Sequence, residues 1–345
     1  MMKKIDFNFY DISTYKDEIY GVSIIWIMLF HAIAILGLDY GKSFPVLSIA
    51  DFLIGFGNMG VEVFLMCSGI CLYFSFRKNS DIGDFLKKRL VRLMLPVIVI
   101  ESIYWAYLCF FSSDGGGWTD FLERLFLLKF WITGDQQVYF VSMILLFYIL
   151  YPYIYSILFS ERRREGGELS RCVMLIAVCV LFTYLIMCGE RDFYDRTEIA
   201  LTRLPVFIFG CYLGKKVYEK KPIDRRWFWI ALIAAILQFI VLGAGFPEGI
   251  CMRYFYLIGG TAVTFLIPMI LKALSWERLN RFLAFFGRIS LNLYLSHIVV
   301  IHLYERTAFY EGKRILDYLV ILIISTVLAA AAEVIIKAVR RRIMQ

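Results

Sequence analysis

Histidine, proline and charged residues are scarce in this chain: three of 345 residues are histidine, seven are proline, and 19% are charged. The eight cysteines lack the spacing of metal ligands and lie mostly within apolar runs, so we expect neither a metal site nor structural disulfides. The glycine triplet at 115–117 has no strand-to-helix context, which argues against a phosphate-binding loop. These absences exclude the common metalloenzyme and nucleotide-loop classes.

Apolar residues dominate instead, at 60% of the chain, and the mean hydropathy is +0.69. A soluble domain has about 45–50% apolar residues, so most of this chain is expected to lie in a lipid bilayer. No polar stretch is long enough for a separate soluble domain, and the first apolar run lacks a small-residue cleavage site. The sequence therefore predicts one integral domain over residues 1–345, a multi-pass protein of the cell membrane.

A membrane helix needs about 20 predominantly apolar residues. Such runs recur along the chain and predict an all-α bundle of about ten transmembrane helices, at roughly 19–38, 52–76, 90–112, 137–159, 171–189, 198–214, 227–243, 253–273, 282–304 and 315–338.

The loops between these ten predicted helices are alternately rich and poor in basic residues. Of the 37 lysines and arginines, 27 fall on the side that holds both termini and only ten on the other. The excess of Lys and Arg in cytoplasmic loops therefore places both termini in the cytoplasm. The net charge of +8 is explained by this asymmetry, so nucleic acid is not an expected partner.

His31 lies within the first apolar run. An ionisable side chain in hydrocarbon is costly, so it usually faces a protein interior or a watery cavity and marks a functional site. Histidine titrates near neutral pH, which suits it to moving protons. The alternative is a neutral imidazole that hydrogen-bonds a neighbouring helix.

Glu62 is the second polar residue of interest and lies in the apolar run at 52–76. A buried carboxylate needs a cation, a histidine or water as its partner, and Glu62 is a candidate to orient or charge-balance His31. The alternative is a position at the membrane surface, where the carboxylate is hydrated. Ser68 and Gly69 suit a close packing of helices better than a nucleophile.

A basic cluster, Lys88, Arg89 and Arg92, precedes Pro96 at the start of the third run. Lys88 and Arg92 are four residues apart and are expected to share a helix face. Arginine forks suit phosphate groups, so a phosphate-rich donor such as a coenzyme A thioester is a candidate ligand. Anchoring to anionic lipid is the alternative.

Arg203 is expected several residues inside the sixth helix, where an arginine either snorkels to the interface or pairs within the bundle. Glu62 is a plausible partner for it.

Helix 282–304 carries a polar stripe. Ser290, Tyr294 and His297 are spaced so that they line one face, which indicates an inward-facing cavity. The alternative for His297 is a structural hydrogen bond. His302 is expected further out, at the interface.

Together these segments resemble the acyltransferase-3 family, the membrane O-acyltransferases of bacterial surface glycans and antibiotics. The resemblance is collinear over nearly the whole chain. It rests on His31, Gly60–Gly69, Lys88–Pro96, Tyr139–Pro152, Arg203–Gly214 and Gly287–His297.

The resemblance implies transfer of an acyl group, most simply acetyl, from cytoplasmic acyl-coenzyme A to a hydroxyl of a surface polysaccharide or lipid-linked sugar, with no permanently bound cofactor. His31 would be the base or would relay the acyl group, and Glu62 would orient it. The remaining expected site residues are donor-binding Lys88, Arg89, Arg92 and Arg203, and cavity-lining Tyr20, Ser68, Tyr139, Ser290, Tyr294 and His297.

Two positions depart from the family pattern. The family usually has arginine or lysine eleven residues before the histidine, where this chain has Tyr20, and Lys16 one turn earlier is a candidate substitute. The family's frequent tryptophan at the start of the fourth helix is Tyr139 here. Two other readings stay open: an exporter that uses the same buried charges as a substrate path, and a non-catalytic membrane module.

Overall fold

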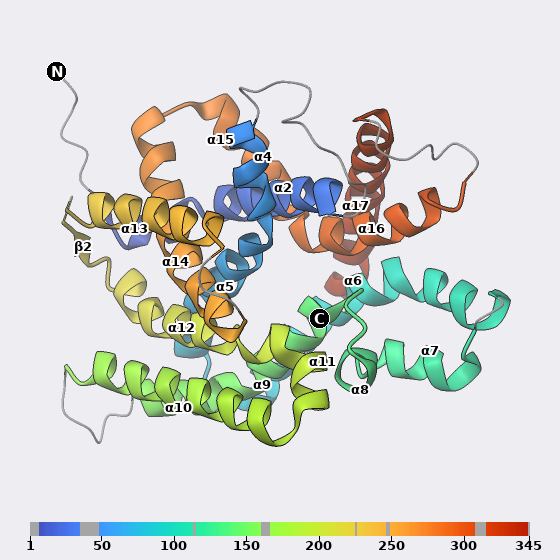
Figure 1. Cartoon of the computed structure of the whole chain (residues 1–345), viewed down its shortest axis with the longest axis horizontal. Coiled ribbons are helices and arrows are strands. Elements are labelled where there is room, and N and C mark those ends of the chain that lie inside the picture. The colour runs from blue at the N-terminus through green and yellow to red at the C-terminus, as the bar shows by residue number, and fades with distance from the viewer. Residues whose placement is uncertain are drawn as a thin grey trace.

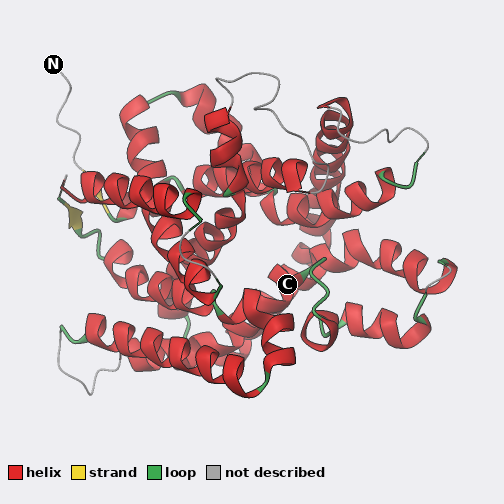
Figure 2. Cartoon of the chain, viewed as in Figure 1, coloured by secondary structure: helices red, strands yellow, loops and turns green. Residues whose placement is uncertain are grey.

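The computed structural model describes residues 7–34, 48–112, 115–159, 166–224, 226–245, 249–307 and 315–343. Nearly all of this part of the chain is helical (Figure 2). The strands found in it are β1 (Phe7–Asn8) and β2 (Pro222–Ile223), which form a short antiparallel pair. The all-α class predicted from composition is confirmed.

The helices follow one another along the chain with short connections. They are α1 (Tyr10–Thr14), α2 (Lys16–Ala34), α4 (Ser48–Gly55), the 3-10 turn η2 (Gly57–Met59), α5 (Gly60–Lys78), α6 (Ile82–Phe111), α7 (Gly117–Leu125), α8 (Lys129–Thr133), α9 (Tyr139–Phe159), α10 (Glu168–Gly189), α11 (Arg191–Leu201), α12 (Leu204–Tyr218), α13 (Arg226–Gly243), α14 (Ile250–Leu274), α15 (Glu277–Arg288), α16 (Ser290–Tyr304) and α17 (Ile315–Ile343).

Seven helices among the described residues are long and apolar enough to cross a membrane, and the count becomes eight if α15 and α16 form one span. Those two helices meet at a bend of 68°. The predicted count of ten is therefore not confirmed. Hydropathy averages over a window, so it does not register a change of backbone direction within an apolar run.

The predicted helix at 198–214 is interrupted in the structure. Helix α11 ends at Leu201 and α12 begins at Leu204, with Pro205 in its first turn. A proline ring clashes with the carbonyl four residues earlier, here that of Leu201, and lacks the N–H for an intrahelical bond. Arg203 therefore lies at the break between two helices, and its predicted place inside one continuous helix is wrong.

Helix α5 lies in the middle of the molecule, beside α2, α12 and α14 (Figure 1). Its contact with α12 depends on glycines at both surfaces. A Cβ placed on Gly69 would lie 2.6 Å from the Phe207 carbonyl oxygen, and one on Gly210 would meet the Met66 carbonyl. Small residues allow helix backbones to approach in this way in membranes.

We expect Gly69→Ala to destabilise the protein by about 1–3 kcal/mol, because the added methyl group meets backbone atoms of Phe207 and Cys211 that cannot move independently. The matched control is Gly55→Ala in α4, where a Cβ would meet nothing within 4 Å. Thermal unfolding of the purified protein in detergent measures both. Equal melting temperatures for the two variants would contradict the close packing of α5 on α12.

A second close contact joins α2 and α15. Gly21 faces the backbone of Leu283, and Gly287 faces the backbone of Asp17. Because α16 turns away from α15 directly after this contact, its residues return along α2. The bend thereby brings the polar stripe of α16 to the helix that carries His31.

Candidate active site

His31 of α2 and His297 of α16 form a hydrogen-bonded pair. Nδ1 of His31 lies 2.8 Å from Nε2 of His297, and the two rings stack with centroids 5.0 Å apart. His297 is 1% exposed, whereas His31 is partly exposed. The two histidines are 266 residues apart in the sequence.

The hydrogen bonds assign the tautomers of this pair. Nδ1 of His297 lies 2.9 Å from the Leu293 carbonyl oxygen, which can only accept, so His297 carries its proton on Nδ1. Its Nε2 then accepts from Nδ1–H of His31. For two neutral rings this leaves Nε2 of His31 with a free lone pair. His31 is thereby set up as a base, with His297 fixing its orientation.

Glu62 pairs with Arg203 and not with His31. Nε of Arg203 donates to Oε1 of Glu62 over 2.8 Å, and each side chain is 4% exposed. The guanidinium also donates to the Ile199 carbonyl and lies over the ring of Tyr139. The pairing suggested from sequence is present. The expectation that Glu62 orients His31 is corrected, since His297 occupies that position.

A large cavity opens beside this histidine pair, with a volume of about 690 Å³. We call it the histidine cavity. Its wall combines aromatic and planar polar side chains from the loops and from α2, α6, α7, α9, α14 and α16. They include His31, Tyr104, Arg124, Asp135, Gln137, Tyr139, Arg203, Arg253 and His302.

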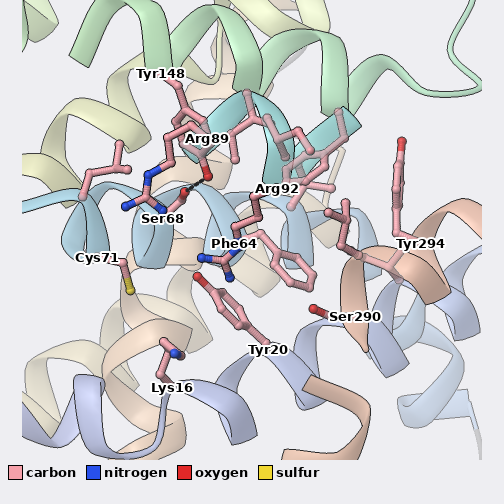
Figure 3. Close-up of a pocket in the computed structure, with 17 residues that line it drawn as sticks. Lys16, Tyr20, Phe64, Ser68, Cys71, Arg89, Arg92, Tyr148, Ser290 and Tyr294 are labelled. Atoms are coloured by element: carbon pink, nitrogen blue, oxygen red, sulfur yellow. Dashed lines mark hydrogen bonds between the residues drawn. The ribbon is translucent and has the colours of Figure 1, made fainter. Parts of the chain in front are cut away.

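A smaller cavity of about 200 Å³ lies among α2, α5, α6, α9 and α16, and we call it the basic cavity. Figure 3 shows Arg92 reaching toward Tyr20 of α2, which also contributes Lys16, while Arg89 lies on the side of Ser68 and Tyr148. Arg89 also lies over the rings of Phe85 and Tyr148. Phe64 and Ile144 add apolar surface to the wall of the basic cavity.

A thin partition separates the two cavities. Ile27, Val61 and Tyr294 each line both of them. The Tyr294 ring centroid is 5.9 Å from that of His297, and Ile27 lies one helical turn before His31. The histidine pair therefore lies beside this partition, with His31 on the wall of the histidine cavity and neither histidine on the wall of the basic cavity.

The predicted donor-binding group is divided by the structure. Arg89 and Arg92 line the basic cavity, but Arg203 lines the histidine cavity. Lys88 lines neither cavity; its side chain is 47% exposed and pairs with Asp84. On a helix, residues three apart also share a face. The expectation that Lys88 and Arg92 share the inward face is therefore wrong, because Arg89 takes that place.

The predicted cavity-lining residues also divide. Tyr20, Ser68 and Ser290 line the basic cavity, Tyr139 lines the histidine cavity, and Tyr294 lines both. The expectation that His297 lines a cavity is wrong for these two cavities, because its ring is buried behind that of His31. The Ser68 hydroxyl is hydrogen-bonded to that of Tyr148 over 2.8 Å. This hydrogen bond between α5 and α9 agrees with a packing role for Ser68.

A polar network beside the histidine cavity was not predicted from the sequence. Glu101, fully buried on α6, accepts from the Gln137 amide over 2.9 Å. Arg124 bridges Asp120 and Asp135 nearby. The sequence feature that could have indicated this network is Glu101, an acidic residue within the apolar run at 90–112.

A family model described as an acyltransferase domain matches residues 20–334. Searches of curated proteins and of solved structures find no match to the chain.

Proposed function

The chain belongs to the acyltransferase-3 family, and on that premise we propose that it transfers an acetyl group from acyl-coenzyme A to a hydroxyl of a surface polysaccharide or lipid-linked sugar. The family and the apolar helices make it a multi-pass membrane acyltransferase. The donor, the acceptor, the cell membrane as its location and the cytoplasmic side of both termini are parts of the proposal.

One observation carries this proposal: two cavities of different chemistry meet at a partition beside a histidine pair. The basic cavity suits the donor, because arginine forks bind phosphates and the apolar side chains on its wall suit a pantetheine arm. The histidine cavity suits a sugar, because aromatic faces and planar polar groups contact its rings and hydroxyls. Donor and acceptor would approach the partition from opposite sides.

The free Nε2 of His31 would take the proton of the acceptor hydroxyl as its oxygen attacks the thioester carbonyl. The carbon–sulfur bond then breaks, and the imidazolium returns the proton to the leaving thiolate. His297 would hold Nδ1–H of His31 throughout. Base help of this kind contributes about 10²–10⁴-fold. The Arg203 guanidinium, on the same cavity as His31, is the candidate to stabilise the oxyanion.

Sealed membrane vesicles test this function. Inverted vesicles that contain the protein and receive radiolabelled acetyl-coenzyme A outside should release free coenzyme A and label glycan or lipid. Right-side-out vesicles should not, because the donor cannot reach the basic cavity. An exporter would leave acetyl-coenzyme A unconsumed in both. Consumption only in right-side-out vesicles would reverse the proposed orientation.

A further inference from the structure

A third cavity, of about 190 Å³, adjoins the basic cavity and shares Lys16, Tyr20 and Arg92 with it. We call it the vestibule. It adds Arg288 at the end of α15, and Glu333 and Arg340 from α17. The C-terminal helix thus supplies one wall of a cavity that continues into the proposed donor site.

The vestibule has an excess of positive charge. Four cations line it, Lys16, Arg92, Arg288 and Arg340, against the two acids Asp17 and Glu333. Asp17 offsets one of the four cations, Lys16, while Glu333 has partners that are not among the four, so the positive charge of the vestibule remains in excess. Asp17 pairs with Lys16 at 3.5 Å, and Glu333 contacts Lys337 at 3.3 Å and the Asn292 amide at 2.8 Å.

Two arginine nitrogens beside these cavities lack a partner. Nε of Arg340 in the vestibule and Nε of Arg89 in the basic cavity are buried without a hydrogen bond among the described residues. The charges of Arg340 and Arg92 also repel each other. A buried unpaired donor is costly, and a bound anion would satisfy these nitrogens and neutralise the repulsion.

We infer that the vestibule binds the 3′-phosphate of the donor coenzyme A, held by Arg288 and Arg340, while Lys16 and Arg92, which line both cavities, hold its diphosphate. This inference rests on the proposed function. The order follows the donor's chemistry, since the 3′-phosphate is the phosphate farthest from the thioester and the vestibule lies beyond the basic cavity. Guanidinium groups bind phosphate oxygens bidentately.

This arrangement also explains how the site can work with Tyr20 at the position where the family usually has arginine or lysine. The Tyr20 ring stacks on Phe64, with centroids 5.0 Å apart, and forms part of the wall of both cavities. Lys16 and Arg340 lie outside residues 20–334, which the family model matches. This chain thus brings cations to the site from beyond the matched region.

Calorimetry of coenzyme A and 3′-dephospho-coenzyme A with the purified full chain tests the inference without requiring transfer. The wild type should bind coenzyme A about tenfold or more tightly than the dephospho form. Arg340→Gln should lose this preference and leave dephospho binding unchanged. Arg288→Gln should act in the same direction. The control is Arg341→Gln, an exposed neighbour outside the vestibule, which should behave as wild type.

Two results would overturn the inference. One is equal affinity of the wild type for both ligands. The other is an Arg340→Gln variant that keeps its 3′-phosphate preference but loses thermal stabilisation by phosphatidylglycerol, which would assign the vestibule to a lipid headgroup. A third result would separate the two proposals. If Arg340→Gln loses the preference for coenzyme A but the wild type transfers no acetyl group in vesicles, the vestibule still binds the 3′-phosphate and the proposed function is rejected.

Discussion

Replacing His31 by alanine is expected to lower acetyl transfer by about 10²–10⁴-fold, because the variant loses the free Nε2 that would take the acceptor proton. The backbone of α2 should persist, since His31 lies on a cavity wall and is only partly buried. Transfer of label from acetyl-coenzyme A in inverted vesicles is the measurement. Coenzyme A binding by the purified variant should be unchanged.

The control for this prediction is His302→Ala. His302 lines the same cavity but is 44% exposed in its side chain and does not contact the histidine pair. Its replacement should lower transfer far less than that of His31, because it removes one of several groups on the cavity wall and leaves Nε2 of His31 in place. Equal transfer by His31→Ala and wild type would reject the histidine mechanism.

His297 is a positioning residue in this scheme, so its variants should depend on what replaces its Nε2 acceptor. His297→Ala removes the acceptor for Nδ1–H of His31 and should lower transfer strongly. In His297→Gln the amide oxygen can accept the same hydrogen bond, and part of the rate should return. A merely structural histidine would not distinguish the two variants at equal folding stability.

The second large effect is expected at the Glu62–Arg203 pair. Both side chains are 4% exposed, so removing either partner leaves an uncompensated charge in the bundle. Breaking a buried pair costs about 3–5 kcal/mol. Arg203→Met and Glu62→Met should therefore each greatly lower thermal stability in detergent, and transfer should fall with it.

The double variant Glu62→Met with Arg203→Met separates stability from chemistry. Apolar residues of similar volume often replace a buried pair without net loss, so folding should largely recover. Transfer should stay low, because the guanidinium proposed to stabilise the oxyanion is absent.

The matched control is Arg253–Glu198, a pair whose arginine lines the same cavity, with a 2.7 Å contact but side chains 23% and 30% exposed. Its disruption should cost about 1 kcal/mol or less, because solvent screens the charges. A Glu62 variant as stable as a Glu198 variant would contradict the buried pairing.

The local sequence determined the helical class of this protein, its family and several candidate site residues. The apolar runs predict its helical class, since period and length are local properties that a window of residues contains. His31 and Glu62 were identified as candidates because polar groups are costly among apolar neighbours, and Arg89 and Arg92 because arginine forks suit phosphate groups. The collinear motifs indicated the family that the matched model confirms.

Tertiary structure decided which partners those residues contact, although the sequence had suggested Glu62 as a partner for Arg203. His31 meets His297 because α15 and α16 bend by 68°, and Arg203 meets Glu62 because Pro205 separates α11 from α12. These contacts join positions 266 and 141 residues apart, so no local period records them. The same holds for the division of the cations between two cavities, since a side chain's direction relative to distant helices depends on how the backbones pack.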